Sequence, residues 1–325
     1  MMSFIVIGRN EGWKLTNCLH SIHQTIDRKK LIDAEVIYVD SKSTDDSLFR
    51  ATEFKGTKIY KLTCDYNAAI ARNVGAEKSV GEILFFIDAD MELMPEFLTK
   101  VLNEKSELIF DFVSGQFCDN YFEKEGDNNL NPYHKFINHR DKRQVVTGGI
   151  FIIKRELWFL VNGMRNKYRR SQDLDFGLRL AKKGIRLLRK QEVIAIHNTV
   201  DKKDKTKIWE FLFSGADLYG RSMLYRDHIT NPNMYIVFLR NDYSLIILFF
   251  ALIYAIALLS PSSFIFYFLV IVVRSAFSSN GILNKIKRMV YFVIRDLIVL
   301  QGFITFFPRH HFSIKYEIVN NGSEN

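Results

Sequence analysis

Two aspartates, Asp88 and Asp90, stand one residue apart at the end of the apolar run 83–87. An apolar run of this length, rich in aromatic and β-branched residues, is typical of a short strand buried on both faces. In an open α/β sheet, ligands bind at the edge formed by the carboxyl ends of the strands. Neighbouring carboxylates repel each other unless a cation lies between them, and oxygen ligands suit Mg²⁺ or Mn²⁺. The pair predicts a divalent-metal site able to hold a diphosphate, and the alternative is a solvated acidic turn.

Composition narrows the classes of protein to consider. The chain has 325 residues, 48% of them hydrophobic, and a formal net charge of +9. A basic chain can bind nucleic acid, a membrane surface or an anionic substrate. Its basic residues are dispersed and match no nucleic-acid module, so no nucleic-acid partner is expected. Three cysteines fit neither a disulfide framework nor a zinc site and suit a reducing compartment, and the N-terminus shows no signal-peptide pattern.

The first hundred residues alternate between strand and helix patterns. Apolar runs predict strands at 3–7, 36–39, 58–62 and 83–87, and helical periodicity or capping predicts helices near 15–26, after 41–47, at 67–79 and at 95–105. Strands that alternate with helices at this spacing form a parallel, doubly wound sheet. The predicted fold class is therefore α/β, with Asp88 and Asp90 at the carboxyl edge of the sheet.

The middle of the chain is less regular. A strand is expected at 108–117, a polar segment at 119–143, an apolar run with a Gly-Gly turn at 144–153, a helix opening at 172–180, and one or two strands at 186–197. The helix carries acidic residues in its first turn, where the helix dipole favours them. Aromatic and apolar residues among charges at 206–225 predict an interfacial helix.

A long apolar stretch at 243–273 contains no charged residue and is interrupted by Pro261. It exceeds the roughly 20 residues needed to cross a bilayer once. It crosses once with a kink, forms a hairpin with Pro261 at its tip, or is a buried soluble helix. Basic flanks on both sides favour the hairpin over a single crossing, because basic loops stay cytoplasmic. A second apolar run at 289–307 is broken by Arg295 and Asp296. Three interpretations of this run stay open, namely a membrane span, an interfacial helix and a buried soluble helix.

These patterns divide the chain into four parts. Residues 1–205 are expected to form the catalytic domain, 206–242 an interfacial amphipathic segment, 243–308 transmembrane or membrane-associated helices, and 309–325 a C-terminal tail.

Several motifs occur in an order that resembles family 2 glycosyltransferases of the GT-A fold. They are Asp40 at the end of the second strand, Ala-Arg-Asn-Val-Gly-Ala at 71–76, Gly-Glu-Ile at 81–83, Asp-Ala-Asp at 88–90, Gly-Gly at 148–149, Asn-Gly-Met at 162–164 and Gln-Asp-Leu-Asp at 172–175. The resemblance covers residues 3–200. It implies a nucleotide-sugar donor, most simply a UDP-sugar, and a divalent metal, Mg²⁺ or Mn²⁺.

The resemblance also assigns binding roles to individual residues. Asp40 matches the aspartate that hydrogen-bonds the nucleotide base, and the corner containing Arg9 and Glu11 matches the segment against the nucleoside. Arg72 matches a cation near the nucleotide. The remaining matched positions are expected to contact the metal or the ribose. Asp88 would contact the ribose or the metal, and Asp90 would bind the metal. His197 stands where some relatives place a third metal ligand.

Asp173 matches the catalytic base of the family, and Asp175 is the second candidate. The residue before the base is Gln172, where the family's signature has a glutamate. A base is needed because the acceptor hydroxyl must lose its proton as it attacks the anomeric carbon. No carboxylate is placed to act as a nucleophile for a double displacement. The expected reaction is a single displacement that inverts the anomeric centre.

The expected function is therefore glycosyl transfer to a lipid-linked or membrane-proximal acceptor at the cytoplasmic face of the cell membrane, in cell-surface glycan biosynthesis. Two alternatives stay open. A processive synthase would carry a Gln-x-x-Arg-Trp motif after the base, and the chain has none. A catalytically inactive nucleotide-sugar-binding membrane scaffold is the other alternative, and Gln172 is the motif residue that favours it.

Overall fold

The computed structural model describes residues 1–31, 33–122, 131–133, 139–200, 216–278, 281–308 and 311–322. The chain forms two compact units, Met1–Lys203 together with Arg309–Asn325, and Asp204–Pro308. The C-terminal residues, expected as a separate tail, contribute strand β11 (Tyr316–Asn321) to the sheet of the first unit, where it pairs with β3.

Four parallel strands form the centre of the first unit. They are β1 (Met2–Gly8), β2 (Ala34–Asp40), β3 (Thr57–Leu62) and β4 (Ile83–Asp88), in the spatial order β3-β2-β1-β4. Their apolar runs are buried on both faces, as parallel strands covered by helices require. The register places Ile7 opposite Asp88 and Gly8 opposite Asp40, so these carboxylates reach the same edge of the sheet.

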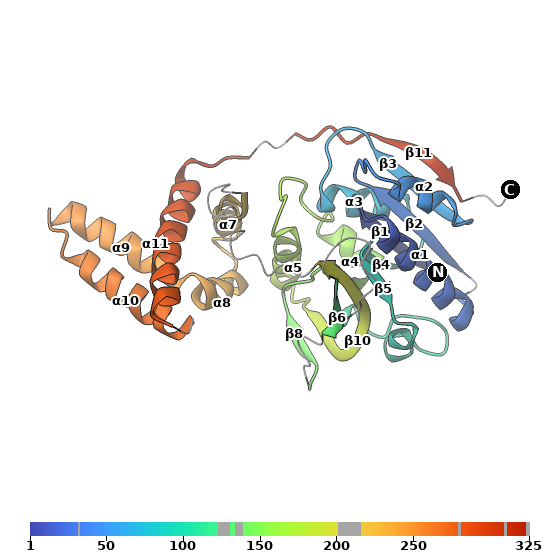
Figure 1. The fold of residues 1–325 in the computed structure, drawn as a ribbon, viewed down its shortest axis with the longest axis horizontal. Helices are drawn as coiled ribbons and strands as arrows, with labels where there is room; N and C mark the ends of the chain where they lie inside the picture. Colours follow the sequence, from blue (N-terminus) through green and yellow to red (C-terminus); the bar gives the residue numbers. More distant parts are fainter. Residues whose placement is uncertain are drawn as a thin grey trace. The chain divides into compact units, whose positions relative to one another are not determined.

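The sheet continues beyond β4 with strands of mixed direction. β9 (Phe151–Lys154) lies antiparallel to β4, and β6 (Phe112–Phe122) follows, parallel to β10 (Leu187–Val200). Three short strands complete this side, β5 (Met91–Leu93) and β8 (Lys142–Gln144) on β10 and β7 (Asn131–Tyr133) on β6. The predicted α/β fold with a large, mostly parallel sheet is confirmed, and Figure 1 shows its strands with the helices on either side.

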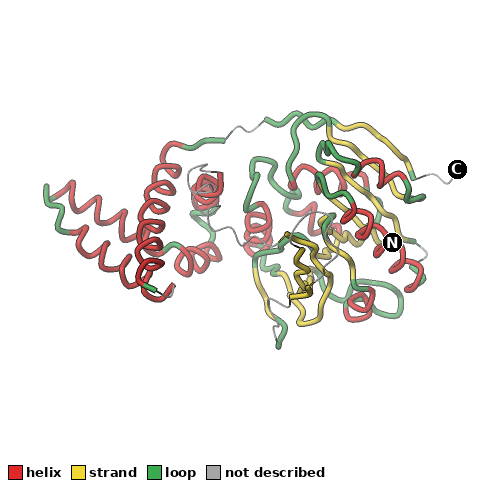
Figure 2. The backbone as a smooth tube through the Cα atoms, in the orientation of Figure 1, coloured by secondary structure: helices red, strands yellow, loops and turns green. Residues whose placement is uncertain are grey.

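Helices cover both faces of the sheet. On one face α1 (Trp13–Lys29) buries Leu15, Leu19 and Ile22, while α2 (Ser47–Thr52) lies beside it. The opposite face is covered by α3 (Ala68–Lys78), α4 (Arg155–Leu160) and α5 (Gln172–Lys182), whose apolar side chains form the second core cluster. The helix predicted at 95–105 is shorter, a 3₁₀ helix η1 (Pro95–Lys100), because the Asn103 side chain accepts backbone hydrogen bonds in the turn that follows. Figure 2 shows the same elements by type.

The second unit is helical. Its helices are α7 (Ala216–Asp227), α8 (Pro232–Asn241), α9 (Tyr243–Ala257), α10 (Ser263–Ser278) and α11 (Ile282–Thr305). Leu248 and Ala251 of α9 pack against Tyr267 and Ile271 of α10, so the stretch 243–273 is a hairpin that turns around Pro261. Among the described helices none is long and apolar enough to cross a membrane by itself; α8 and α9, bent by 90°, meet the criterion only as a pair.

Candidate active site

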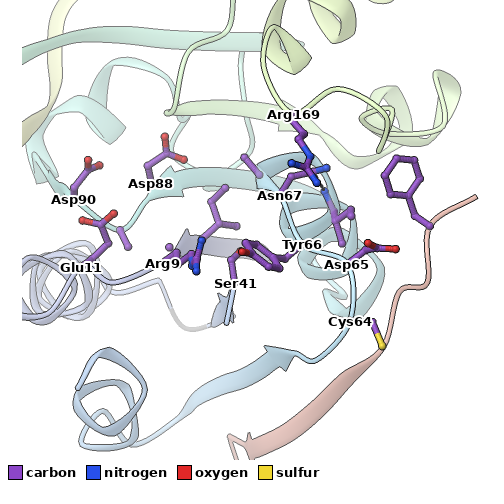
Figure 3. Close-up of a pocket in the computed structure, with 16 residues that line it drawn as sticks. Arg9, Glu11, Ser41, Cys64, Asp65, Tyr66, Asn67, Asp88, Asp90 and Arg169 are labelled. Carbon is purple, nitrogen blue, oxygen red and sulfur yellow. Dashed lines mark hydrogen bonds between the residues drawn. The ribbon is translucent and has the colours of Figure 1, made fainter. Parts of the chain in front are cut away.

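A pocket of about 510 Å³ opens at the carboxyl edge of the parallel strands. Its walls come from the ends of β1, β2, β3 and β4, the start of α3 and two later segments; they include Gly8, Arg9, Glu11, Ser41, Cys64, Asp65, Tyr66, Asn67, Asp88, Asp90, Arg169 and Phe312. In Figure 3 the carboxylates of Glu11, Asp88 and Asp90 lie at one end, and Tyr66, Asp65 and Arg169 lie toward the other. A ligand spanning the pocket would meet three carboxylates at one end, and an aromatic ring, a guanidinium and the single carboxylate of Asp65 at the other.

Asp88 is held by a buried arginine. The Arg72 guanidinium, with 2% of its side chain exposed, donates to Asp88 Oδ1 at 2.5 Å. Desolvation raises the pKa of Asp88 to about 6, the Arg72 charge opposes this rise, and the charge of Asp90 adds to it. The cation predicted near the nucleotide, Arg72, is therefore present. It holds Asp88 in position but does not itself line the pocket.

Asp90 meets His197, a residue 107 positions later in the chain. His197 Nε2 lies 3.2 Å from Asp90 Oδ2, and His197 Nδ1 lies 2.8 Å from Asp119 Oδ1. The meeting follows from strand pairing, since His197 of β10 stands opposite Met91 of β5 and beside Asp119 of β6. Burial lowers the pKa of His197, but the hydrogen bonds and charges of Asp90 and Asp119 outweigh it and raise that pKa to about 9.

The side chains around Asp90 decide whether a divalent cation could be held there. Within the described ranges no group of three or more His, Cys, Asp and Glu side chains is arranged to hold a metal ion. Asp90 Oδ1, however, is buried and has no hydrogen-bond partner. A buried carboxylate oxygen without a partner is costly, and a cation would satisfy it. Asp90 and His197 supply an oxygen and a nitrogen ligand, which fits a cation that takes its remaining ligands from a diphosphate and water.

Metal affinity is expected to depend on pH through His197. The ring binds a metal only after it loses its proton, so the metal and the proton compete for the site. With a pKa of about 9 in the metal-free protein, the imidazole is protonated at neutral pH. The Mn²⁺ affinity should therefore rise by up to about tenfold per pH unit from about pH 7 to about pH 8.5. Calorimetric Mn²⁺ titrations measure this slope, and His197→Gln should flatten it; an equal slope in both proteins would exclude His197 as a ligand.

Asp40 is the last residue of β2 and lies next to the pocket without lining it. Its buried carboxylate accepts hydrogen bonds from Tyr38 Oη at 3.0 Å and from the Ser43 N–H at 2.9 Å. These bonds fix the turn after β2, and it is Ser41 that reaches the pocket lining. The structure thus places Asp40 next to the pocket with both carboxylate oxygens hydrogen-bonded.

The β1–α1 corner supplies Arg9 and Glu11 to the pocket, as its position in the sheet predicts. The Arg9 guanidinium stacks over the Tyr66 ring at 4.6 Å from the ring centre. Glu11 pairs with Lys14 at 2.5 Å, and burial raises the pKa of the Glu11 carboxyl. A flat cation stacked on an aromatic ring is a suitable platform for a planar base.

Several lining residues were not among the predicted site residues, and those with large side chains include Asp65, Tyr66, Asn67, Arg169 and Phe312. The first three come directly after β3, and the carboxyl end of a predicted parallel strand was a usable signal for them. Asn67 also caps α3 by accepting from the Ile70 N–H at 2.9 Å. Arg169 and Phe312 follow no predicted strand, so no local pattern marks them.

Phe312 reaches the pocket because the C-terminal segment returns to the sheet. Asp65 N–H donates to the Ser313 carbonyl at 3.0 Å, and Ser313 N–H donates to Asp65 Oδ2 at 2.8 Å. The Thr63 N–H continues this ladder by donating to the Lys315 carbonyl at 2.9 Å. A segment that follows the whole helical unit therefore closes one wall of the pocket.

Asp173 stands in the first turn of α5 and does not line the pocket itself. Arg189 lies near it: burial lowers the pKa of Arg189 to about 10, and the charge of Asp173 opposes that fall. Arg189 also donates to the Thr147 carbonyl at 2.8 Å and to the Gly115 carbonyl at 2.6 Å. Arg189 thus ties the turn before Gly149 to strand β6, and its charge lies close enough to Asp173 to interact with it.

Asp175 has a different environment. Its side chain is fully buried and pairs with Arg165 at 3.2 Å and with Arg179 at 2.9 Å. Such a carboxylate is committed to its two guanidinium partners, which is typical of a structural ion pair. Just before the base candidate, the Gln172 Oε1 atom is buried without a hydrogen-bond partner.

Gly149 lies against the acidic end of the pocket. A Cβ at this position would come within 2.1 Å of Asp88 Oδ2. We therefore expect Gly149→Ala to displace the Asp88 carboxylate and lower turnover by about tenfold or more, since positioning errors near 1 Å cost about that much or more. Steady-state kinetics with the donor measure this loss. Gly184→Ala is the comparison: no atom lies within 4 Å of its Cβ, but its φ of +84° strains any alanine there, so this variant measures the effect of backbone strain away from the pocket; equal losses in both variants would count against the Asp88 contact.

With this geometry described, the chain can be compared with known proteins. The model of the family "Glycosyl transferase family 2" matches residues 3–190. The chain belongs to glycosyl transferase family 2. The resemblance stated from the motifs is thereby confirmed.

Individual relatives of this family 2 chain are similar to it over shorter stretches. The 4,4'-diaponeurosporenoate glycosyltransferase of Staphylococcus haemolyticus is 36% identical over 101 residues, which cover 29% of this chain and 25% of that protein. The chain spans less than half the length of the curated relatives that it matches.

Solved structures agree in fold. A mannosyltransferase from Pyrobaculum calidifontis in complex with GDP-Man and Mn²⁺ superposes with a TM-score of 0.58 at 14% identity, covering 92% of this chain and 86% of the other. GalNAc-T7 with UDP, GalNAc and Mn²⁺ gives a TM-score of 0.50 at 15% identity, covering 70% and 54%. At these identities the likeness shows the GT-A fold alone.

Proposed function

We propose that this family 2 protein transfers a sugar from a nucleotide-sugar donor to an acceptor, with a divalent cation at Asp90 and His197. The observation that carries the proposal is the unpartnered, buried Asp90 Oδ1 next to His197, at the edge of a pocket of about 510 Å³. Structural neighbours that bind GDP-Man with Mn²⁺, and UDP with Mn²⁺, support the choice of donor class and metal.

The pocket suggests how the donor is held. The nucleoside lies against Arg9, Tyr66 and Ser41, and the diphosphate lies toward Asp88 and Asp90. A cation bound there would neutralise the charge that develops on the departing diphosphate. Arg72 keeps Asp88 in place from behind, and the Asp88 carboxylate is left to contact the ribose or the metal. UDP is the expected nucleotide.

Asp173 is the proposed base, in preference to Asp175. It accepts the proton of the acceptor hydroxyl as that oxygen bonds to the anomeric carbon, while the bond from that carbon to the diphosphate breaks and its electrons leave with the diphosphate. One such displacement inverts the anomeric centre. Asp173 is preferred because the Asp175 carboxylate pairs with Arg165 and Arg179.

We place the protein at the cytoplasmic face of the cell membrane, acting on a lipid-linked or membrane-proximal glycan acceptor. The support is the apolar surface of the helical unit, where Phe250, Ile256 and Phe266 are largely exposed. An acceptor held at the membrane would account for such an attachment.

A donor screen tests the proposed function. UDP-, GDP- and dTDP-sugars are added with Mn²⁺ to the full chain, and thermal stability and donor turnover are measured. We expect one nucleotide class to raise the melting temperature by several degrees, because a ligand at about 100 times its Kd stabilises by about 2.7 kcal/mol. Turnover should stop with a chelator and return with Mn²⁺. Binding without turnover, with acceptor lipids supplied, would instead indicate the scaffold; no binding of any donor would overturn the proposal.

A further inference from the structure

The hairpin of α9 and α10 carries an apolar surface that no described residue covers. Six of its side chains are between 47% and 92% exposed, namely Phe249, Phe250, Ile256, Leu259, Ile265 and Phe266. No charged residue occurs between Asp242 and Arg274. The contacts between the two arms use only one side of each helix, through Leu248, Ala251, Tyr267 and Ile271. The outward sides of both arms are therefore apolar.

The base of the hairpin is closed by buried charges. Asp242 pairs with Arg221 at 2.7 Å and with Arg295 at 2.6 Å. Asp296 pairs with Arg295 at 3.1 Å and accepts a hydrogen bond from Ser244 at 2.5 Å. Arg295 and Asp296, which interrupt the apolar run at 289–307, are therefore buried inside the helical unit, where each pairs with an opposite charge.

Basic side chains occur on the segments that flank the hairpin. Arg274 lies at the end of α10, where it donates to Ser244 Oγ at 2.5 Å and stacks over Phe292 at 4.1 Å. Lys285, Lys287 and Arg288 follow on the first turns of α11, and Arg240 ends α8. Basic residues next to an apolar surface complement the anionic headgroups of a cytoplasmic leaflet.

The arms are too short to cross a bilayer. α9 has 15 residues and α10 has 16, which at 1.5 Å per residue gives about 23 Å and about 24 Å. The hydrocarbon core is about 30 Å thick, so one leaflet contributes about 15 Å. A tilted hairpin of this length fits within one leaflet, and the charged base would resist deeper entry.

From these observations we infer that the α9–α10 hairpin inserts into a single leaflet of an anionic membrane and turns back within it, with the loop 258–262 in the hydrocarbon and the cluster of Asp242, Arg295 and Asp296 at the headgroup level. Figure 1 shows α9 and α10 side by side, extending away from α11 and joined by this loop at their far end. The inference rests on the proposed membrane localisation and is independent of glycosyl transfer. In this arrangement the hairpin anchors the protein without crossing the bilayer. The segments before α9 and after α10 then stay on the same side of the membrane.

Flotation with vesicles tests the attachment. The full chain is mixed with vesicles of 7:3 phosphatidylcholine and phosphatidylglycerol, and the bound fraction is measured on a density gradient. Phe266→Asp should weaken binding at least about tenfold, because an aspartate in lipid is strongly unfavourable. Phe49→Asp is the matched control, since Phe49 is similarly exposed (69% against 60%) but lies on α2 of the first unit. Absence of flotation, or equal losses in both variants, would overturn the inference.

Cysteine labelling tests the depth of insertion. Leu259→Cys at the tip, 92% exposed, is treated with a membrane-impermeant maleimide placed either outside the vesicles or inside them, with the parent chain as the background. We expect protection from both sides after binding and full labelling once detergent is added. Labelling from inside would show a crossing, and labelling from outside would show a tip left in water. Either result would overturn the single-leaflet hairpin, and neither would alter the donor screen.

Discussion

Asp90→Ala is expected to reduce glycosyl transfer by about 1000-fold or more. The variant loses the proposed oxygen ligand at the acidic end of the pocket, and electrostatic stabilisation of a leaving diphosphate is commonly the largest contribution to catalysis. It also removes the partner of His197 Nε2. Donor turnover with saturating Mn²⁺ measures the loss, and circular dichroism confirms that the variant is folded.

Asp111→Ala is the matched control for this loss. Asp111 is an exposed carboxylate that pairs with Lys154 at 2.7 Å on the surface. Exposed pairs contribute little to stability, so this variant should keep its turnover within about twofold. If Asp90→Ala kept wild-type turnover, or if a chelator had no effect on the wild type, the metal at this site would be excluded and the proposed chemistry with it.

Asp173→Asn is expected to lower kcat by about 100-fold to 10,000-fold, the usual contribution of a general base. The KM for the donor should change little, because Asp173 lies outside the pocket lining. The free energy of unfolding should also stay close to that of the wild type. Steady-state kinetics with both substrates, together with denaturant unfolding, measure these three quantities.

Asp175→Asn provides the comparison. This substitution leaves the partner arginines of a fully buried carboxylate, Arg165 and Arg179, without their counter-charge. Removing one partner of a buried ion pair costs about 3–5 kcal/mol, and the lower end applies because the Arg165 side chain is 41% exposed. We therefore expect a stability defect from Asp175→Asn and a catalytic defect from Asp173→Asn. The reverse result would make Asp175 the base.

Most residues at the acidic end of the site could be predicted from the sequence, because they follow predicted strands. Glu11, Asp88 and Asp90 come after β1 and β4, and the carboxyl ends of parallel strands must meet at one edge. The roles assigned to them, including those of Asp40, Arg72 and His197, stay predictions. The hydrophobic pattern is local, so it predicts where these residues lie along the chain and does not establish their roles.

The pocket walls depended on contacts that no local pattern encodes. Phe312 lines the pocket only because the chain returns after the helical unit and pairs with β3. His197 meets Asp90 only because β10 pairs with both β5 and β6. Each contact joins residues that are far apart in the sequence and is set by strand pairing.

The amino-acid sequence by itself determined the α/β class, the family and the placement of two aspartates at a strand end, because burial patterns and strand–helix alternation are properties of neighbouring residues. Only the tertiary structure decided which of Asp173 and Asp175 is enclosed by arginines, that the apolar stretch at 243–273 folds as a hairpin, and that the C-terminal segment closes the pocket. Those outcomes depend on which distant surfaces pack together, and hydrophobic packing is non-directional, so many arrangements satisfy the same local pattern.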